Sequence, residues 1–145
     1  MAHFPTGVTI VTALAKEGPA GLAANAVTSL SLDPPLVLAC LDNSSRTLET
    51  VLAAGAFGIN LLAAGEDTVA RSFARKVPMG EKWEGTAWHP LAGVPALEGS
   101  VVSIACGLQD AFPGGDHKIL TGEVLAIEIA AGDPAPLRFH AGGYG

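Results

Sequence analysis

Alternating apolar and polar positions are the main pattern along the chain, and they predict mostly β-strands. Residues 27–32 (VTSLSL) have a period of two, and residues 7–13 (GVTIVTA) are rich in β-branched side chains. Lys16-Glu17-Gly18-Pro19 follows residues 7–13 and has turn chemistry, so we expect a hairpin there. The predicted strands cover residues 7–13, 20–26, 27–32, 36–41, 57–62, 100–108, 118–129 and 137–139.

Two segments have a helical period instead. Apolar residues at helical spacing begin at Leu48, with Ser44 or Ser45 as the candidate N-cap, and Gly55 is typical of the end of such a helix. Residues 66–76 (EDTVARSFARK) place their apolar side chains on one helical face and predict a second helix.

Closely spaced hairpins with two or three short helices favour a mainly β fold, an antiparallel barrel with Greek-key links, over a doubly wound sheet. No GxGxxG run joins a strand to a helix, which disfavours a Rossmann nucleotide site. Residues 81–95 are expected to be loop-rich, with Trp83 and Trp88 as packing anchors. A length of 145 residues predicts one domain, residues 1–145.

Composition narrows the possible partners. The net charge is −6 and no run of Lys and Arg is present, so we expect no nucleic-acid partner. No apolar stretch approaches the roughly 20 residues that cross a bilayer, and MAHFPTG is unlike a signal peptide, so we expect a cytoplasmic protein and no membrane partner. Charged residues are only 15%, which favours a face buried against a second copy, Gly- and Ala-rich loops, or both.

Cys40 and Cys106 are expected to be reduced core thiols.

Residues 23–26 (AANA) are expected to form a strand edge with almost no side-chain bulk apart from the Asn25 amide. A flat aromatic ligand can approach such a backbone, and the Asn25 amide can both donate and accept hydrogen bonds in the plane of that ligand. The alternative is tight packing of these small residues against another strand or subunit.

A candidate anion site lies at the start of the first predicted helix. Ser45, Arg46 and Thr47 combine hydroxyls, a positive charge and free backbone N–H groups, which suit a phosphate. Arg75 and Lys76 supply two more cations at the C-terminus of the second predicted helix, and together the two segments would clamp a phosphate if they meet in space. The alternative is an ordinary N-cap.

Asp116 and His117 follow two glycines between two predicted strands, and the carboxylate can orient the imidazole. The alternative is a turn with a surface histidine. His3, His89 and His140 have no metal-ligand spacing with His117 or with each other, so no metal site is expected.

The ordered blocks FPTGVTIVTA, GLAANAVTSLSLDPPLVLACLD, SSRT, FARK, GGDHKILTGEV and PLRFHAGGYG resemble the short-chain flavin reductases. These are FMN-binding split-barrel proteins that serve two-component flavin monooxygenases, and the similarity extends from Phe4 to Tyr144. The resemblance implies an antiparallel Greek-key split β-barrel and a homodimer with FMN or FAD near the subunit interface. It also implies hydride transfer from NADH or NADPH to the flavin, which then passes to a partner oxygenase.

The resemblance further implies residue roles. The flavin-binding positions are Gly21, Leu22, Ala23, Asn25, Ala26, Thr28, Ser29, Cys40, Leu41, Asp42, Ser45, Arg46, Thr47, Arg75, Lys76 and Tyr144. Of these, Ser45, Arg46 and Thr47 would hold the phosphate. Asp116 and His117 are the implied catalytic pair beside the nicotinamide, with His117 orienting it by a hydrogen bond.

Other functions stay open at this point. One is a non-reductase flavin or deazaflavin protein related to pyridoxamine-phosphate oxidase. Another is a flavin-binding or structural dimer without turnover, and a third is a haem-binding barrel, for which no clear axial histidine is present. The choices between NADH and NADPH, and between FMN and FAD, are not determined by these residues.

Overall fold

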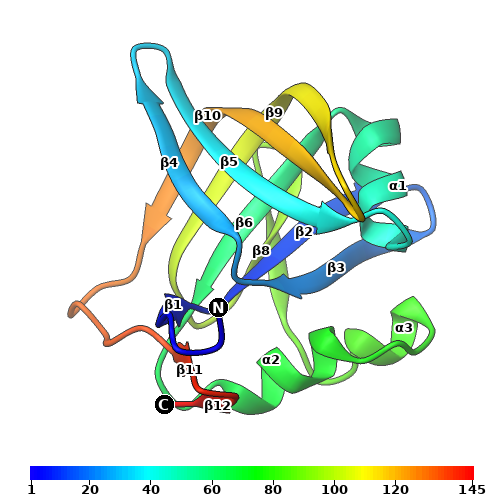
Figure 1. Cartoon of the computed structure of the whole chain (residues 1–145). Helices are drawn as coiled ribbons and strands as arrows, with labels where there is room; N and C mark the ends of the chain where they lie inside the picture. Colours follow the sequence, from blue (N-terminus) through cyan, green and yellow to red (C-terminus); the bar gives the residue numbers. More distant parts are fainter.

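A seven-stranded antiparallel sheet forms the body of the computed structural model, which describes residues 1–145 (Figure 1). Its strands are β2 (Thr9–Ala15), β3 (Gly18–Ala24), β4 (Val27–Leu32), β5 (Pro35–Asp42), β6 (Ala56–Leu62), β9 (Ser100–Gly114) and β10 (His117–Ile129). They lie in the order β3-β2-β6-β9-β10-β5-β4, so several neighbours are distant in sequence, as in a Greek-key arrangement. The mainly β prediction is confirmed.

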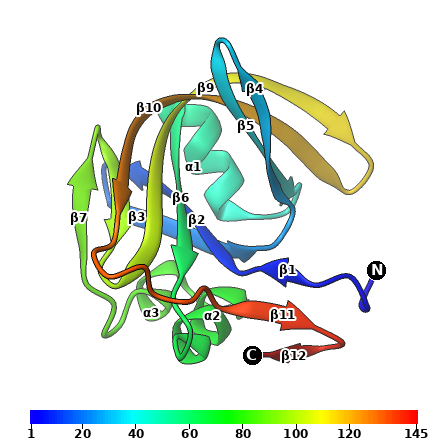
Figure 2. The ribbon, with the colours of Figure 1, turned by 90° about the vertical axis from the view of Figure 1, so that its left-hand side faces the viewer.

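The sheet is curled into a barrel that remains split along one side. Strands β3 and β4 follow each other in sequence, yet they occupy opposite edges of the sheet and do not pair. The chain crosses between these edges at Asn25 and Ala26, where the Cys40 amide donates a hydrogen bond to the Ala26 carbonyl (2.9 Å). Figures 1 and 2 show the curvature, with α1 seated against the barrel.

Three short helices lie outside the sheet: α1 (Arg46–Ala54), α2 (Asp67–Ala74) and α3 (Met79–Lys82). The predicted caps of the first helix are confirmed, since the Ser45 hydroxyl accepts from the Leu48 amide (2.9 Å) and Gly55 adopts a left-handed conformation (φ 67°). Helix α2 ends earlier than predicted, because Arg75 is already extended.

The prediction of a loop-rich segment over residues 81–95 was wrong. The chain there forms a hairpin of β7 (Trp88–Leu91) and β8 (Val94–Leu97) with a tight turn at Ala92 and Gly93, both at positive φ. Pro90 and Pro95 pair with each other across the hairpin. A proline inside a segment argues against a strand because it lacks an N–H, and here each proline faces a partner that also has none to donate.

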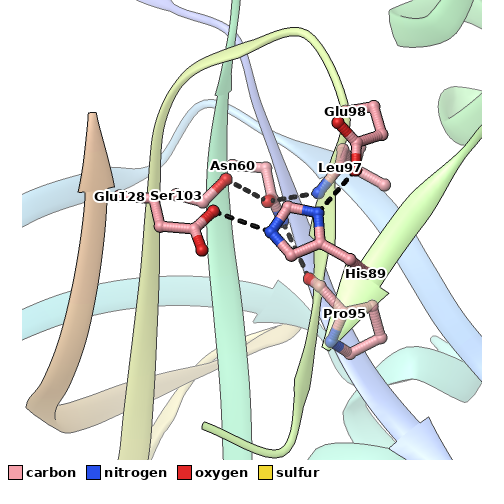
Figure 3. Close-up of polar contacts among 7 residues, drawn as sticks. All are labelled: Asn60, His89, Pro95, Leu97, Glu98, Ser103 and Glu128. Carbon is pink, nitrogen blue, oxygen red and sulfur yellow. Dashed lines mark hydrogen bonds and ion pairs between the residues drawn. The ribbon is translucent and has the colours of Figure 1, made fainter. Parts of the chain in front are cut away.

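A buried polar network attaches this hairpin to the barrel (Figure 3). The Asn60 side chain on β6 is fully buried, accepts hydrogen bonds from the Leu97 amide (2.9 Å) and the Ser103 hydroxyl (2.8 Å), and donates to the Ile10 carbonyl (3.2 Å). At the surface, both ring nitrogens of His89 lie 2.7 Å from carboxylate oxygens, one of Glu98 and one of Glu128.

The remaining strands form a small terminal sheet of β1 (Thr6–Gly7), β11 (Arg138–His140) and β12 (Gly143–Tyr144). The predicted first strand is therefore divided in two, with Val8 between β1 and β2. The last predicted strand, residues 137–139, is displaced by one residue. This sheet brings the C-terminal segment beside α2 (Figure 2).

The core consists of two apolar clusters. One fills the barrel and includes Leu41, Phe57 and Leu120, and the other lies between the barrel and α2 and includes Phe73. Trp83 packs edge-on against Phe73 (4.9 Å between ring centroids), and Trp88 contacts Trp83 in the same way (6.2 Å), which supports their predicted packing role.

Both cysteines are free in the structure. Cys106 is fully buried in the barrel cluster, where burial raises the pKa of its thiol to about 12, and Cys40 is half-buried. None of the three helices combines the length and apolar character needed to cross a membrane.

Candidate functional site

A cavity of about 600 Å³ lies between the start of α1, strand β3 and the segment that joins α2 to α3. Its walls include Ser45, Arg46 and Thr47 on one side and Arg75 and Lys76 on the other. The structure therefore brings together the two segments that the sequence marked as a possible phosphate clamp. Leu22, Ala23 and Asp42, three further predicted positions, also line this cavity.

The loop before α1 is held in shape by Asp42. Its carboxylate accepts hydrogen bonds from the Ser44 hydroxyl and the Ser44 amide, each at 2.7 Å. These two bonds are the main reason that the pKa of Asp42 lies below its usual range, with the positive charges of His117 and Lys76 as smaller contributions. Asp42 is thus occupied within the loop, and it orients the chain that enters the helix.

Thr47 has a polar atom without a protein partner. The residue is 1% exposed, lies in the first turn of α1, and its hydroxyl makes no hydrogen bond within the protein. Most buried hydroxyls are paired, so an unpaired one beside a cavity suits a ligand group that can complete it. The free N–H groups of the first helical turn and the positive end of the helix dipole favour an anion at the same place.

Four positively charged side chains line the cavity: Arg46, Arg75, Lys76 and Lys82. Lys82 was missed by the sequence reasoning. Its ammonium lies 3.2 Å from the Phe73 carbonyl and 3.5 Å from the Gly21 carbonyl, and burial lowers its pKa. No pattern in the sequence marked Lys82, because the short α3 helix that carries it follows a predicted break.

Gly21, another predicted flavin-binding position, is packed against α2 and α3. Its amide donates to the Met79 sulfur (3.4 Å), so this N–H is not free for a ligand. A side chain at this position would also collide with Phe73 (2.8 Å) and approach Trp83 (3.2 Å). The small residue is required here because α2 and α3 pack directly onto β3.

A second hollow of about 210 Å³ continues from the cavity along the end of β3. Ala23 and Ala74 line both, and Asn25, Phe139 and Tyr144 line the second alone. This hollow is almost entirely apolar, with the Asn25 amide at its edge. Tyr144 packs against Phe139 (5.3 Å between ring centroids), so the C-terminal strand forms one wall of this hollow.

Asp116 and His117 lie at the turn between β9 and β10, next to the loop that precedes α1. His117 pairs with Asp42 in the sheet register, and the Asn43 side chain donates to the Gly115 carbonyl (3.0 Å). The Asp116 carboxylate is 2.7 Å from Nδ1 of His117, as expected for an oriented imidazole. Both side chains are accessible and stand outside the two hollows.

The other predicted positions lie on β4, β5 and the crossing between β3 and β4. Ala26, Thr28 and Ser29 are exposed, and Cys40 is half-buried next to Ala26. Leu41 is fully buried in the barrel cluster, so its side chain faces the core and not the groove. The structure places these residues beyond the apolar hollow, where they border neither of the two hollows.

The paired hollows fit a phosphorylated flavin. A planar tricyclic ring matches the narrow apolar end with its single amide, and a phosphate matches the cationic end with its unpaired Thr47 hydroxyl. The order is also suitable, because the two ends meet at Ala23 and Ala74, as a ring and its tail would. Ala23, Ala24 and Asn25, three of the four small-residue positions 23–26, line the second hollow.

Comparison with known proteins agrees with this geometry. The family model described as "Flavin reductase like domain" matches residues 1–145. The chain is 36% identical to the reductase subunit HsaB of a flavin-dependent monooxygenase from Mycobacterium tuberculosis, over 99% of this chain and 77% of that protein. It is 38% identical to the FMN reductase (NADH) RutF of Agrobacterium fabrum, over 97% of this chain and 81% of that protein.

A solved structure has the same fold. The NADH:FAD oxidoreductase SgcE6 of Streptomyces globisporus C-1027, in complex with NAD and FAD fragments, superposes with a TM-score of 0.91 at 32% identity, covering 99% of this chain and 86% of that one. The match over the whole length and the split antiparallel barrel lead to one conclusion: the chain belongs to the flavin reductase-like family.

Proposed function

We propose that this protein is an NADH-dependent flavin reductase that passes hydride to FMN or FAD and supplies the reduced flavin to a partner monooxygenase. The observation that carries the proposal is the continuous groove with an apolar end at Asn25 and Tyr144 and a cationic end at Thr47. A binding module for a neutral ligand would have no need of the cationic end.

The residues of the chain contribute binding and orientation. Ser45, Arg46 and Thr47 hold the phosphate at the start of α1, with Arg75 and Lys76 on the facing wall. The Asn25 amide forms hydrogen bonds with the polar edge of the flavin ring, and the alanines beside it allow the ring to approach the backbone closely. When bound, the flavin supplies the ring that accepts the hydride, and the protein supplies its position and electrostatics.

We assign Asp116 and His117, which stand outside the two hollows beside the loop before α1, to the nicotinamide. The 2.7 Å contact from Asp116 fixes the plane of the imidazole, so His117 can hold the nicotinamide amide by a hydrogen bond. Hydride transfer requires no acid or base from the protein, which is why we assign His117 a positioning role and not that of a proton donor.

The cofactor assignment is also part of the proposal. The relative RutF is named an FMN reductase that uses NADH, and SgcE6 is named an NADH:FAD oxidoreductase. These names favour NADH over NADPH and leave FMN and FAD as equal candidates. The relative HsaB is named a reductase subunit of a flavin-dependent monooxygenase, which favours an oxygenase partner reached by flavin transfer.

We further propose a homodimer. Leu125, Ile127 and Ile129 lie two residues apart on one face of β10, and each is more than half exposed. Leu30 and Leu32 on β4 are also exposed, in a chain with few charged residues. An apolar strand face of this kind is typical of an interface between copies.

The homodimer has its own test. The change Ile127→Lys places a charge in the centre of the apolar strand face, and we expect it to convert a dimer into a monomer by light scattering after size exclusion. Lys118→Met, on the same strand, is a control that should leave the mass unchanged. A monomeric wild-type protein would refute the dimer.

Steady-state oxidation at 340 nm tests the activity. NADH and NADPH are each supplied with FMN, FAD and riboflavin, and we expect the fastest oxidation with NADH and a phosphorylated flavin. Absence of oxidation with every pair, together with flavin binding, would instead support a non-reductase flavin protein related to pyridoxamine-phosphate oxidase. Tightly retained flavin without turnover would support a binding role alone.

A further inference from the structure

Lys82 differs from the other cations of the cavity. The side chains of Arg46, Arg75 and Lys76 belong to exposed residues, whereas Lys82 is half-buried. Exposed charges are screened by water and salt, and their long side chains must be ordered when a ligand binds. A half-buried, hydrogen-bonded ammonium has lost most of that freedom before the ligand arrives, so more of its interaction energy remains available for recognition.

The contacts of Lys82 leave part of its bonding capacity unused. Its ammonium donates to the carbonyl of Phe73 (3.2 Å) and lies at the limit of a hydrogen bond to the carbonyl of Gly21 (3.5 Å). An ammonium has three N–H donors, so at least one remains for the cavity that Lys82 lines. The adjacent acid, Glu81, is 3.7 Å from Arg75, and Lys82 itself makes no salt bridge.

Lys82 and the first residues of α1 line the same cavity. Helix α3 lies below β3 and α1 lies above it in Figure 1, and the cavity is bounded by both. A phosphate at the first turn of α1 therefore has helix N–H groups on one side and the α3 segment on the other. The ammonium supplies the balancing positive charge from within the protein.

We propose that Lys82 is a specificity-determining residue that selects phosphorylated flavins over riboflavin by donating a charge-assisted hydrogen bond to the flavin phosphate. This inference rests on the proposed flavin reductase function. The lowered pKa of Lys82 agrees with it, because an ammonium desolvated without an anionic partner is stabilised when an anion binds beside it. Riboflavin has the same ring but no phosphate, so it cannot make this contact.

The experiment removes the Lys82 ammonium from the protein and the phosphate from the ligand, separately and together. Dissociation constants for FMN and for riboflavin are measured by fluorescence titration with the wild type, Lys82→Met and Lys82→Arg. We expect Lys82→Met to weaken FMN binding by about tenfold, as for a lost charged hydrogen bond, and to change riboflavin binding by less than about twofold. Lys82→Arg should recover most of the FMN affinity. Lys16→Met, an exposed lysine in the first hairpin, is the matched control and should change neither.

Equal losses for FMN and riboflavin would overturn the proposal, because they would show that Lys82 only fixes α2 to β3. Unchanged FMN affinity would also overturn it, as would an effect confined to the KM of NADPH. If Lys82→Met does not fold, Lys82→Gln takes its place, because it removes the charge and retains an N–H donor for the two carbonyls. We expect it to weaken FMN binding more than riboflavin binding by the same factor as Lys82→Met. Failure of the proposed function gives a different result, since the wild type would then bind no FMN or oxidise no NADH.

Discussion

The network around Asn60 and the groove around Thr47 are both polar, but they differ in how completely their hydrogen bonds are made. Asn60 is fully buried, and both its oxygen and its nitrogen have protein partners (Figure 3). Thr47 is almost as deeply buried, yet its hydroxyl has none. Folding completes the hydrogen bonds of the first region, and we propose that a ligand completes those of the second.

This difference distinguishes buried polar groups that stabilise the fold from buried polar groups that are available to a ligand. A complete buried network fixes one arrangement of strands, here the attachment of the β7–β8 hairpin to the barrel. An incomplete one costs stability unless a ligand completes it. We therefore expect substitutions in the Asn60 network to act on folding and substitutions in the groove to act on flavin binding, and four predictions test this separation.

The largest effect is expected from Asn60→Leu. The change leaves the Leu97 amide and the Ser103 hydroxyl buried without the Asn60 oxygen that accepts from both, and each such group costs about 1–3 kcal/mol. We expect a loss of about 3 kcal/mol in the free energy of unfolding, measured by urea denaturation. Ser103→Ala removes only one donor of the same network and should cost less. If the free energy of unfolding of Asn60→Leu lies within about 0.5 kcal/mol of the wild-type value, the Asn60 network is not a structural element of the kind we describe, and the two polar regions do not differ in this respect.

Thr47→Val should have the opposite effect from Asn60→Leu, with little change in stability and a clear loss of FMN affinity. The hydroxyl has no partner in the protein, so its removal should leave the free energy of unfolding nearly unchanged or slightly higher. We expect FMN binding to weaken by roughly tenfold, the amount of one hydrogen bond to a charged group. Thr50→Val, on the same helix and with its hydroxyl on the Arg46 carbonyl, is a control for helix effects. A large loss of stability with unchanged FMN affinity would contradict the assignment of Thr47.

The two regions also differ in how far the sequence alone predicted them. The start of α1 followed from local chemistry, since an N-cap serine and a C-terminal glycine act within a few residues. The β7–β8 hairpin and its Asn60 anchor did not, because the side chain that fixes the hairpin is 37 residues away from Leu97. A proline generally argues against a strand because it lacks an N–H, and only the mutual pairing of Pro90 and Pro95 reconciles them with a ladder.

The same reason explains which site residues were found. Ser45, Arg46 and Thr47 carry a local signal for anion binding, and the cations at Arg75 and Lys76 could be noticed as a pair. Lys82 has no local signal, because its role depends on carbonyls of β3 and α2 that only the folded chain brings to it. That the Leu41 side chain faces the core and not the groove was likewise visible only once β5 was placed in the barrel.

His117→Ala should have a smaller effect, confined to the reduction step. The imidazole lies outside the two hollows, so flavin affinity should stay within about twofold of the wild type, whereas flavin reduction by NADH should slow by roughly tenfold through the loss of one positioning hydrogen bond. Stopped-flow absorbance of the flavin measures the step directly. His140→Ala, an exposed histidine on β11, is the control. Reduction at the wild-type rate would leave His117 as a turn residue.

The smallest expected effect is a pH dependence of stability that arises from His89, which lies at the surface of the β7–β8 hairpin. Hydrogen bonds that the His89 ring donates to Glu128, the larger contribution, and to Glu98 raise the pKa of His89, because both ring nitrogens can donate only when the imidazole is protonated. A raised pKa in the folded state means that this stabilisation is complete below the ordinary value of 6.5 and is lost as the pH rises through the higher folded value. The glutamates must also be ionised, which requires a pH above about 5.

We therefore expect the difference in Tm between wild type and His89→Gln to be larger at pH 6 than at pH 9. The three side chains are exposed enough for solvent to screen them, so the difference should be small and should shrink further in about 0.5 M salt. Flavin affinity at pH 6 should be the same for both proteins, because the groove lies elsewhere. A Tm difference that grows with pH would show that neutral His89 makes the stronger contacts, and a change in flavin affinity would show that the two polar regions are coupled.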